Sequence, residues 1–445
     1  MNRTQYLMAL YDALKDIPSQ ERTDVISEYR EYFRIEMENG RTEEEICSSL
    51  GDPVTLAYAI KQRRGYGPDS QETFYKKPHR KNGIFKTIAT VISAIVVLCI
   101  VFGGTIMFSF SKGKGLIFGA AKKYEINDVR TITPDSAKTI IIKTASTDTS
   151  ILPSDSEIIK GSLVGNVRAT SPDHVPTLKI TRSGDTIIIE EKREVFGVIG
   201  FYWEDVKLDI SIPESFKGAV EFEGTSGDLK ASDLDIGNFL LKVSSGNVRL
   251  DNITVENNMK LTSGSGDFMV KELKATKLIL QSTAGNKEFR DVYIKENFNI
   301  NSTSGDTVLN SIKCHELGID STSGNINIDK LQLDRISIET KSGDVNVRDL
   351  EGNAQIDASS GNINVSVKEA DEEIYIKAIS GDIELRMPAD KSFTLDSRTS
   401  SGNINCDFKL EDKVSDDNTL KGIYLNGDIL LNIKTSSGNI DIERQ

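Results

Sequence analysis

The chain has 445 residues, of which 38% are hydrophobic and 27% charged, so it is long enough for more than one domain and too apolar to be disordered throughout. The formal net charge is −13 at pH 7, and the segment from Glu221 to the C-terminus alone carries 25 Lys/Arg against 38 Asp/Glu. Because nucleic-acid binding depends on basic surfaces, we expect no direct nucleic-acid partner.

The first 67 residues carry helical signals. Leu7, Leu10 and Leu14 repeat at the spacing of one helix face, and Asp52-Pro53 has the form of an N-cap with proline in the first turn. Further apolar helix faces are predicted between Leu14 and Asp52. The pattern predicts a small all-α bundle of short amphipathic helices over residues 1–67.

Several short motifs in this segment occur together: Ile17-Pro18 before Glu21-Arg22, an aromatic run from Tyr29 to Phe33, Gly40 before Glu43-Glu44-Glu45, and Leu50-Gly51-Asp52-Pro53. As a set they resemble the HAAS domain of bacterial membrane proteins. The resemblance implies a cytoplasmic helical domain that signals to a regulator protein, often of the PadR type, and makes Tyr29 and Phe33 candidates for the partner surface. The alternative is a domain that only caps a membrane anchor.

A basic linker, residues 68–86, precedes 25 residues without a charged side chain, 87–111. Such a segment is long enough for one helical crossing of a ~30 Å hydrocarbon core. The near flanks hold five basic residues each, and Arg63 and Arg64 tip the balance towards a cytoplasmic N-terminus. The sequence therefore predicts a single-pass protein of the cell membrane, in contact with lipid through this helix, with an extracytoplasmic C-terminal domain.

Residues 112–220 are expected to form a juxtamembrane segment and a β capping region, because "TIIIKT" and "VKLDISIP" alternate like strands without a fixed period. Within this region Phe201, Tyr202 and Trp203 form an aromatic cluster. It is a candidate partner or ligand surface, and the alternative is a cap on the end of a repeat domain.

Residues 221–445 contain a repeat with a period near twenty, marked by a tight turn in which Gly is followed by Asp or Asn. Glycine and Asp/Asn both tolerate the positive φ that such turns need. The turn pairs are Gly227-Asp228, Gly246-Asn247, Gly266-Asp267, Gly285-Asn286, Gly305-Asp306, Gly324-Asn325, Gly343-Asp344, Gly361-Asn362, Gly381-Asp382, Gly402-Asn403 and, after a longer insert, Gly438-Asn439.

Each repeat carries two runs of alternating apolar residues, such as Ile336 and Ile338 before Gly343, and Val345 and Val347 after it. Alternation of this kind indicates strands with one buried face. The repeats could stack as coils of a β-solenoid or pair as hairpins of a long meander. We favour the solenoid, because like turns then stack on like turns and no long sheet edge is left uncovered.

From Gly227 to Gly402 the residue after glycine alternates strictly between Asp and Asn. If the turns stack about 4.8 Å apart, the alternation separates like charges by nearly 10 Å, and Asn can join a hydrogen-bonded ladder between them. A calcium site is disfavoured, because one Asp for every two coils supplies too few oxygen ligands. We therefore expect no metal site at the turns. The turns also contain no motif for a cofactor or a catalytic site, and none is expected.

The "VKLDISIP" strand, which ends at Pro213, and the Gly-Asp/Asn series that follows resemble the bacterial "putative adhesin" family. The resemblance implies a β-solenoid ectodomain on a cell-envelope protein, with an unidentified envelope ligand. It offers no catalytic residue.

The predicted fold class is thus multidomain: a small all-α bundle, one transmembrane helix and an all-β solenoid. We expect a signalling or binding protein and no enzyme, since none of the three histidines lies in a recognisable motif. An adhesin-like or structural rod is the alternative, and a solenoid polysaccharide-processing enzyme is the third. A bridge between Cys314 and Cys406 is left open.

Overall fold

The computed structural model describes residues 3–15, single positions between 22 and 57, and residues 122–169, 172–193 and 203–445. The chain divides into two compact units, Met1–Val101 and Phe102–Gln445, and each is described by itself.

The N-terminal unit contains helix α1 (Arg3–Ala13). Its apolar residues repeat at helical spacing, so they share one face, and that face is buried. The buried side chains are Tyr6, Leu7, Leu10 and Leu14, which pack in two clusters against Ile26, Phe33 and Ala57.

The fold class expected from the sequence is wrong in its helical parts. The sequence predicted a helical bundle, a membrane helix and a solenoid. The structure shows an all-β repeat domain with one short N-terminal helix. Helix α1 has 11 residues, about 16 Å at 1.5 Å per residue, which is too short for a ~30 Å hydrocarbon core. The expected transmembrane segment, 87–111, lies outside the described residues, and within those residues no helix is both long and apolar enough to span a membrane.

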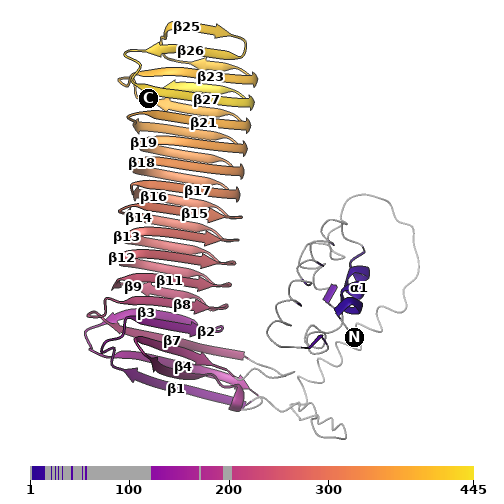
Figure 1. Ribbon diagram of the computed structural model, residues 1–445, viewed down its shortest axis with the longest axis vertical. Helices are drawn as coiled ribbons and strands as arrows, with labels where there is room; N and C mark the ends of the chain where they lie inside the picture. The colour runs from indigo at the N-terminus through magenta and orange to yellow at the C-terminus, as the bar shows by residue number, and fades with distance from the viewer. Residues whose placement is uncertain are drawn as a thin grey trace. The chain divides into compact units, whose positions relative to one another are not determined.

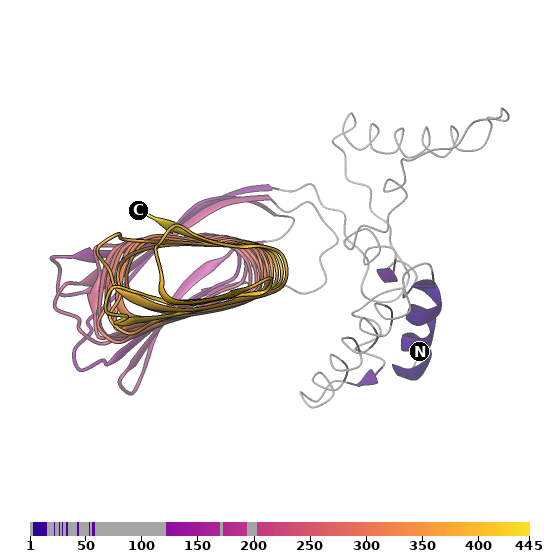
Figure 2. The ribbon, with the colours of Figure 1, turned by 90° about the horizontal axis from the view of Figure 1, so that it is seen from above.

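The second unit is a β-solenoid, which confirms the predicted repeat architecture (Figure 1). Neighbouring coils pair in parallel and in register: Ile328 lies beside Val347, and Val347 beside Val365. A meander would pair its repeats antiparallel, so this alternative is excluded. Seen along the axis, the coils superpose as one flattened loop (Figure 2).

The strands alternate buried and exposed side chains, so each coil sends one row of apolar residues into a common core. In chain order the elements of this unit are β1 (Lys122–Ile132), β2 (Thr139–Thr144), β3 (Asp148–Ser154), β4 (Ile159–Ala169), η1 (Pro172–His174), β5 (Thr177–Ser183), β6 (Thr186–Lys192), β7 (Trp203–Pro213), β8 (Ala219–Gly224), β9 (Leu229–Ser232), β10 (Asp235–Ile236), β11 (Asn238–Val243), β12 (Val248–Ser263), β13 (Phe268–Ser282), β14 (Lys287–Ile294), β15 (Asn297–Ser302), β16 (Thr307–Lys313), β17 (Glu316–Ser323), β18 (Ile326–Ser342), β19 (Val345–Ser360), β20 (Ile363–Glu369), β21 (Glu373–Ser380), β22 (Ile383–Met387), β23 (Phe393–Ser401), β24 (Ile404–Cys406), β25 (Glu411–Asp416), β26 (Thr419–Tyr424), β27 (Ile429–Ser437) and β28 (Ile440–Arg444).

Each coil turns at two corners. At the first corner, ten of the eleven predicted turn glycines have positive φ. Gly343 shows why: its φ is 120°, and a Cβ atom added there would lie 2.2 Å from the carbonyl oxygen of Gly324 in the coil below. The glycine is thus required both by backbone conformation and by the close stacking of the turns.

The second corner is also regular, although the sequence analysis assigned it no motif. Seven non-glycine residues there have φ between 51° and 58°, and each is followed by a buried apolar residue. They are Asp233, Asn252, Glu272, Asp291, Ser311, Lys330 and Asp349. One residue in the left-handed region therefore bends each of these coils.

Both ends are closed by a chain that folds back on itself. At the N-terminal end, the coil formed by β2 and β3 lies between β6 and β7 on one side and β8 and β9 on the other. Strands β1, β4 and β7 pair antiparallel beneath it. At the other end, the hairpin of β25 and β26 covers β23. These caps protect the ends of an otherwise open stack.

The last coil is inserted between two earlier coils. Strands β27 and β28 pair in parallel with β21 and β22 on one side and with β23 and β24 on the other. The chain thus leaves a coil position empty after β22, builds the terminal cap, and returns to fill it. In Figure 1, β27 accordingly lies between β21 and β23.

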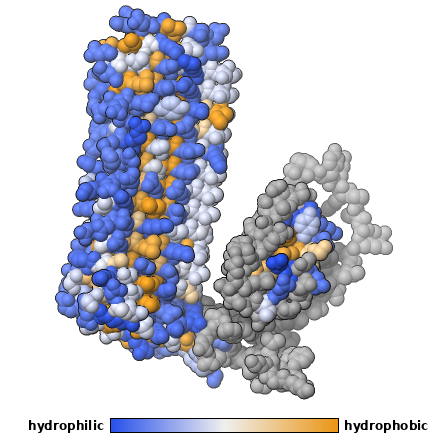
Figure 3. Space-filling model, in the orientation of Figure 1, coloured by the Kyte–Doolittle hydropathy of each residue, from blue (hydrophilic) through white to orange (hydrophobic). Residues whose placement is uncertain are grey.

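The surface of the solenoid is mostly hydrophilic, with an apolar stripe along the face shown in Figure 3. Of the exposed large apolar residues, Leu240 and Ile279 stand in one stack on either side of Lys260. A basic side chain therefore separates these two in the stack.

Candidate ligand groove

The Asp and Asn residues of the Gly-Asp/Asn turns form a continuous hydrogen-bonded column. In each coil the side-chain Oδ1 accepts a hydrogen bond from the backbone N–H of the corresponding residue in the next coil. Eleven such bonds, of 2.7–3.1 Å, link Asp148, Asp228, Asn247, Asp267, Asn286, Asp306, Asn325, Asp344, Asn362, Asp382, Asn439 and Asn403, in that order. The ladder expected from the alternation is present, but main-chain amides are its donors.

From Asp228 onward the two residue types differ in the length of the bond they accept, whereas the bond accepted by Asp148 at the end of the column is 3.0 Å. Bonds accepted by Asp228, Asp267, Asp306, Asp344 and Asp382 measure 2.7–2.8 Å. Bonds accepted by the five asparagines measure 3.0–3.1 Å. A carboxylate acceptor gives a shorter, charge-assisted bond, so Asp strengthens the column where Asn dilutes its charge.

The column begins one coil before the Gly-Asp/Asn series, and at its other end the spatial order differs from the sequence order. Asp148, which the sequence analysis did not single out, precedes Asp228, so two carboxylates are neighbours there. At the other end Asn439 of the inserted coil lies between Asp382 and Asn403. Strict alternation therefore holds in space from Asp228 to Asn439.

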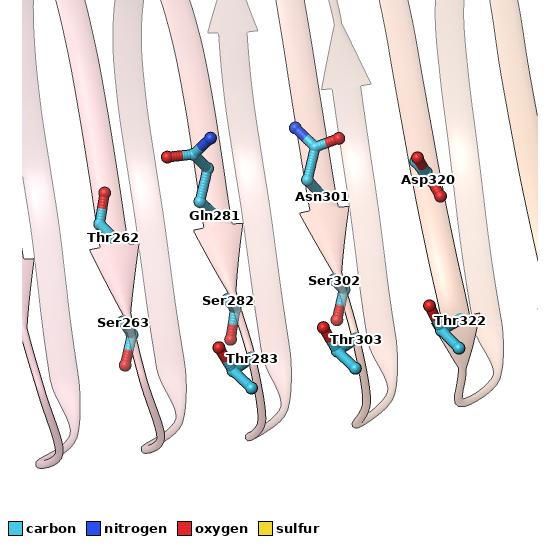
Figure 4. Close-up of a pocket in the computed structure, with 10 residues that line it drawn as sticks. All are labelled: Thr262, Ser263, Gln281, Ser282, Thr283, Asn301, Ser302, Thr303, Asp320 and Thr322. Carbon is cyan, nitrogen blue, oxygen red and sulfur yellow. The ribbon is translucent and has the colours of Figure 1, made fainter. Parts of the chain in front are cut away.

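A groove of about 340 Å³ lies on the other side of these turns, on the strands that lead into them. We call it the polar groove. Its lining residues are Thr262, Ser263, Gln281, Ser282, Thr283, Asn301, Ser302, Thr303, Asp320 and Thr322, shown in Figure 4.

Three columns of side chains build the polar groove, because β12, β13, β15 and β17 stack in register. One column, Thr262–Gln281–Asn301–Asp320, points outward from the strands. A second column of serines is buried. A third column, Thr283–Thr303–Thr322, stands at the start of the turns, where Gly264 leaves the column open in the coil before. The columns run across the stacked strands, along the solenoid axis (Figure 4).

The buried serines close the turns from inside. The hydroxyl groups of Ser263, Ser282 and Ser302 each donate to the carbonyl oxygen two residues ahead, at 3.0–3.2 Å. Such bonds stabilise a turn locally. These serines thus fix the wall of the polar groove, and the outward columns remain for contact with a ligand.

The outward column is uncharged only in three of the four coils that line the polar groove, because the fourth coil contributes Asp320. Eight of the eleven Gly-Asp/Asn turns have a charged residue at this position, and the three exceptions are Thr262, Gln281 and Asn301. The charged residues in the same position are Glu223, Lys242, Asp320, Glu339, Asp357, Lys377, Arg398 and Lys434. The groove is therefore an interruption in an otherwise charged row.

The outward side chains of the polar groove have unused hydrogen-bonding groups. Across the part of the chain that the structure describes, none of the side chains of Thr262, Gln281, Asn301, Asp320 and the three threonines forms a hydrogen bond or an ion pair. On the opposite face, by contrast, Asn364 donates to Asn346, and Asn346 donates to Asn327, at 2.8 and 3.0 Å. The side chains of the groove are thus free, whereas these three asparagines of the opposite face bond to one another.

A buried lysine lies behind the polar groove. Lys287 is fully buried in a row whose other inward members are mostly apolar, and its Nζ donates to Ser302 Oγ, to the Ser304 carbonyl at 2.8 Å and to the Gly305 carbonyl at 3.0 Å. Burial lowers the pKa of Lys287 to about 8, against the opposite effect of Asp306 and Asp267. Lys287 thereby holds the turn that carries Thr303.

The structure describes three of the five aromatic residues predicted as partner surfaces. Phe33 is fully buried, with its ring 5.9 Å from that of Tyr6, and Tyr29 is half-buried. Their side chains belong to the helix core. Trp203 begins β7, and Phe201 and Tyr202 lie outside the described residues.

Cys314 and Cys406 are both free thiols, so they form no bridge. Cys314 is buried, and burial raises the pKa of its thiol to about 12. It therefore stays protonated at neutral pH and packs as a small apolar residue.

Motif reasoning missed the polar groove, although the sequence contains a signal for it. Three consecutive turns, "QSTAGN", "NSTSGD" and "DSTSGN", contain Ser-Thr directly after the outward residue. No other turn of the series does. Comparing one position across all turns, instead of examining one turn at a time, would have found it.

Comparison with known proteins supports the resemblance of the N-terminal segment. Residues 5–59 match the HAAS family. Among curated proteins none matches the chain. The solved structures it resembles include a "putative cell adhesion protein" from Clostridium sporogenes, with 12% identity over 72% of this chain and 100% of that one and a TM-score of 0.18.

Two further solved structures are of proteins described as a "putative adhesin". The one from Bacteroides fragilis is 12% identical over 71% of this chain and 97% of its own, with a TM-score of 0.27. The one from Parabacteroides merdae is 12% identical over 73% and 98%, with a TM-score of 0.28. The family assignment rests on the sequence match: the Toastrack DUF4097 family matches residues 137–297 and 291–443, which is most of the chain, and the chain belongs to this family.

Proposed function

We propose that this protein acts at the bacterial cell envelope, where its solenoid binds an envelope component in the polar groove. In this proposal the HAAS domain passes the binding state to a cytoplasmic regulator protein, of the PadR type by family resemblance. The observation that carries the binding role is the uncharged interval at Thr262, Gln281 and Asn301 in a row that is charged in the other turns.

The groove suits binding better than catalysis. Hydrolytic chemistry needs a nucleophile with a base or a pair of carboxylates, and the polar groove has one carboxylate, Asp320. Its buried serine hydroxyls donate to turn carbonyls and lie beside no histidine of the lining. We therefore propose that the protein is not an enzyme.

A second candidate function, an adhesin-like or structural rod, is favoured by the hydrogen-bonded column. It runs from Asp148 to Asn403 through every coil, and both ends of the solenoid are capped. These features make a stable column whether or not a ligand binds. The two candidates differ in the effect of substitutions in the groove. Such substitutions would weaken a binding protein's retention on its ligand but would leave the function of a rod unchanged.

The test is retention of the purified full-length protein on an isolated bacterial envelope fraction. Gln281→Lys with Asn301→Lys puts charge into the groove on exposed positions, and Ser337→Lys with Gln355→Lys is the charge-matched control on the same face. We expect about tenfold weaker retention for the groove variant, the equivalent of one or two lost polar contacts, and unchanged retention for the control. Equal retention of all three proteins would reject the groove as the binding site.

The regulator arm is tested separately, because a PadR-type partner is inferred from family alone. Met8 on α1 is 65% exposed, whereas Phe33 is buried, so Met8→Lys is the suitable probe. Loss of binding to a purified PadR-type regulator from the same genome, with thermal stability retained, would support the signalling role. No binding by the unmodified full-length protein would remove it.

A further inference from the structure

We propose that the ligand of the polar groove is an uncharged, hydroxyl-rich oligosaccharide that lies parallel to the solenoid axis. This inference rests on the proposed function and names the chemical class of its ligand. It is drawn from the spacing of the groove side chains, from their free hydrogen-bonding groups and from the charges at the two ends of the groove.

The first argument is periodicity. Coils stack about 4.8 Å apart, so the columns of the groove repeat a polar group at that interval over four coils, roughly 14 Å in all. Successive sugars of a linear β-linked glycan lie at a similar spacing, and each carries several hydroxyl groups. One sugar per coil can therefore place a hydroxyl group beside the columns at each step, and the groove is long enough for an oligosaccharide.

The second argument is the chemistry of the free groups. Gln281 and Asn301 each offer an amide donor and an amide acceptor, and Thr283 and Thr303 each offer a hydroxyl group that can do both. Sugar hydroxyl groups also donate and accept. Each can therefore form a hydrogen bond with an amide or a hydroxyl group, either as donor or as acceptor. These outward groups have no partner within the described chain, so a ligand need not break an internal bond to reach them.

The third argument is charge. On one side the row continues with Lys242, and on the other with Asp320, Glu339 and Asp357. A polyanion extended along the axis would be repelled by the acidic side chains, and a polycation that reaches the other end would be repelled by Lys242, although the acidic side chains attract it. Between these limits Thr262, Gln281 and Asn301 provide an uncharged interval, and a neutral chain fits it without repulsion.

The buried Lys287 does not change this assignment. Its ammonium group is directed at Ser302 Oγ and at the carbonyl groups of Ser304 and Gly305, so it is saturated by the turn. Asp306 and Asp267 are the nearby carboxylates that compensate its charge. It positions the turn with Thr303 and leaves no free cation in the groove.

The experiment measures binding of soluble probes to the full-length protein by calorimetry. The probes are cellohexaose and N-acetylchitohexaose, both uncharged, with hexagalacturonate as the anionic and chitosan hexamer as the cationic comparison. The variant combines Thr283→Val, Thr303→Val and Thr322→Val, which keep the side-chain shape and remove three hydroxyls. The matched control makes Ser359→Val, Ser400→Val and Ser436→Val at the same turn position in coils outside the groove.

We expect at least one uncharged probe to bind more tightly than both charged ones, to compete with the envelope fraction, and to lose about tenfold in affinity in the threonine variant but not in the serine control. If neither uncharged probe competes while retention on the envelope still depends on Gln281 and Asn301, the glycan assignment is wrong and the proposed function stands. If retention never depended on the groove, the proposed function fails first. Tighter binding of a charged probe, or equal loss in both triple variants, also overturns the assignment.

Discussion

Asp344 Oδ1 accepts a hydrogen bond of 2.8 Å from the backbone N–H of Asn362, one coil further along the solenoid. The backbone N–H of Asp344 in turn donates to Asn325 Oδ1 at 3.0 Å. Each side chain of the column thus satisfies a main-chain donor of its neighbour. The repeated Gly-Asp/Asn turn is explained by this relationship without a ligand.

Removing one acceptor from the column should destabilise the solenoid. Asp344→Ala leaves the N–H of Asn362 without its partner and is expected to lower the free energy of unfolding by about 1 kcal/mol. Asp344→Asn keeps an acceptor and should cost less than half as much, because only the charge-assisted part is lost. Urea denaturation of the full-length protein measures both, and equal losses would show that the charge, rather than the acceptor, matters.

Glycine at the first corner is required by both conformation and space. Gly343→Ala puts a Cβ atom 2.2 Å from the carbonyl oxygen of Gly324 at φ 120°, so we expect a loss of at least ~2 kcal/mol in the free energy of unfolding. Gly318→Ala is the control. Its φ is not in the left-handed region, and its Cβ would meet only the movable amide of Asn299, so it should cost under ~0.5 kcal/mol.

The second corner should respond to left-handed propensity. Glu272 has φ 54°, where a non-glycine residue with a long side chain is strained, and Asn occupies the same corner in the coil before, at Asn252. Glu272→Asn should therefore raise the free energy of unfolding by about 0.5 kcal/mol, and Glu272→Val should lower it by more than ~1 kcal/mol, since β-branched residues avoid this region. Thermal unfolding of the two variants decides it: a more stable valine variant would contradict this account of the corner.

Lys287 makes stability depend on pH. Its pKa falls from 10.5 to about 8 on folding, so between these values the unfolded chain binds more protons than the folded one. The free energy of unfolding should therefore rise across pH 8 to 10.5, by up to about 3 kcal/mol from this group alone. Lys287→Met should remove that rise while Ser302 still donates to the carbonyl group of Ser304.

The control for this titration is Lys260→Met, which removes an exposed lysine of the same domain. It should leave the pH profile of the unfolding free energy unchanged. A profile that is the same for the unmodified protein and for Lys287→Met would show that the buried amine is not the cause.

The sequence was sufficient for the repeat, the parallel stacking and the polar column, because a period near twenty and a strict Asp/Asn alternation constrain every coil alike. It could not place the last coil. The apolar alternation of Ile429–Ser437 fits beside any other coil, so insertion between β21 and β23 follows only from the tertiary structure. The burial of Lys287 was equally hidden, since lysine normally indicates an exposed position.

The candidate site was missed for a different reason. Thr262, Gln281 and Asn301 belong to different strands, and each is an ordinary polar residue by itself. They are recognised as one surface once the register of β12, β13 and β15 is known. The burial of Phe33 was not predictable for a related reason. Phe33 has the spacing of a helix face, and spacing does not tell whether that face meets the core or a partner.

The most direct test of the groove as the binding site is a gain of binding, because structural damage cannot imitate it. Asp320→Asn and Glu339→Gln extend the uncharged interval by two coils, and Lys341→Thr extends the threonine column by one coil, all at exposed positions. Retention of the full-length protein on the envelope fraction should become several-fold to about tenfold tighter, as expected for added polar contacts. Unchanged or weaker retention, with stability preserved, would contradict the claim that the uncharged interval is what the ligand recognises.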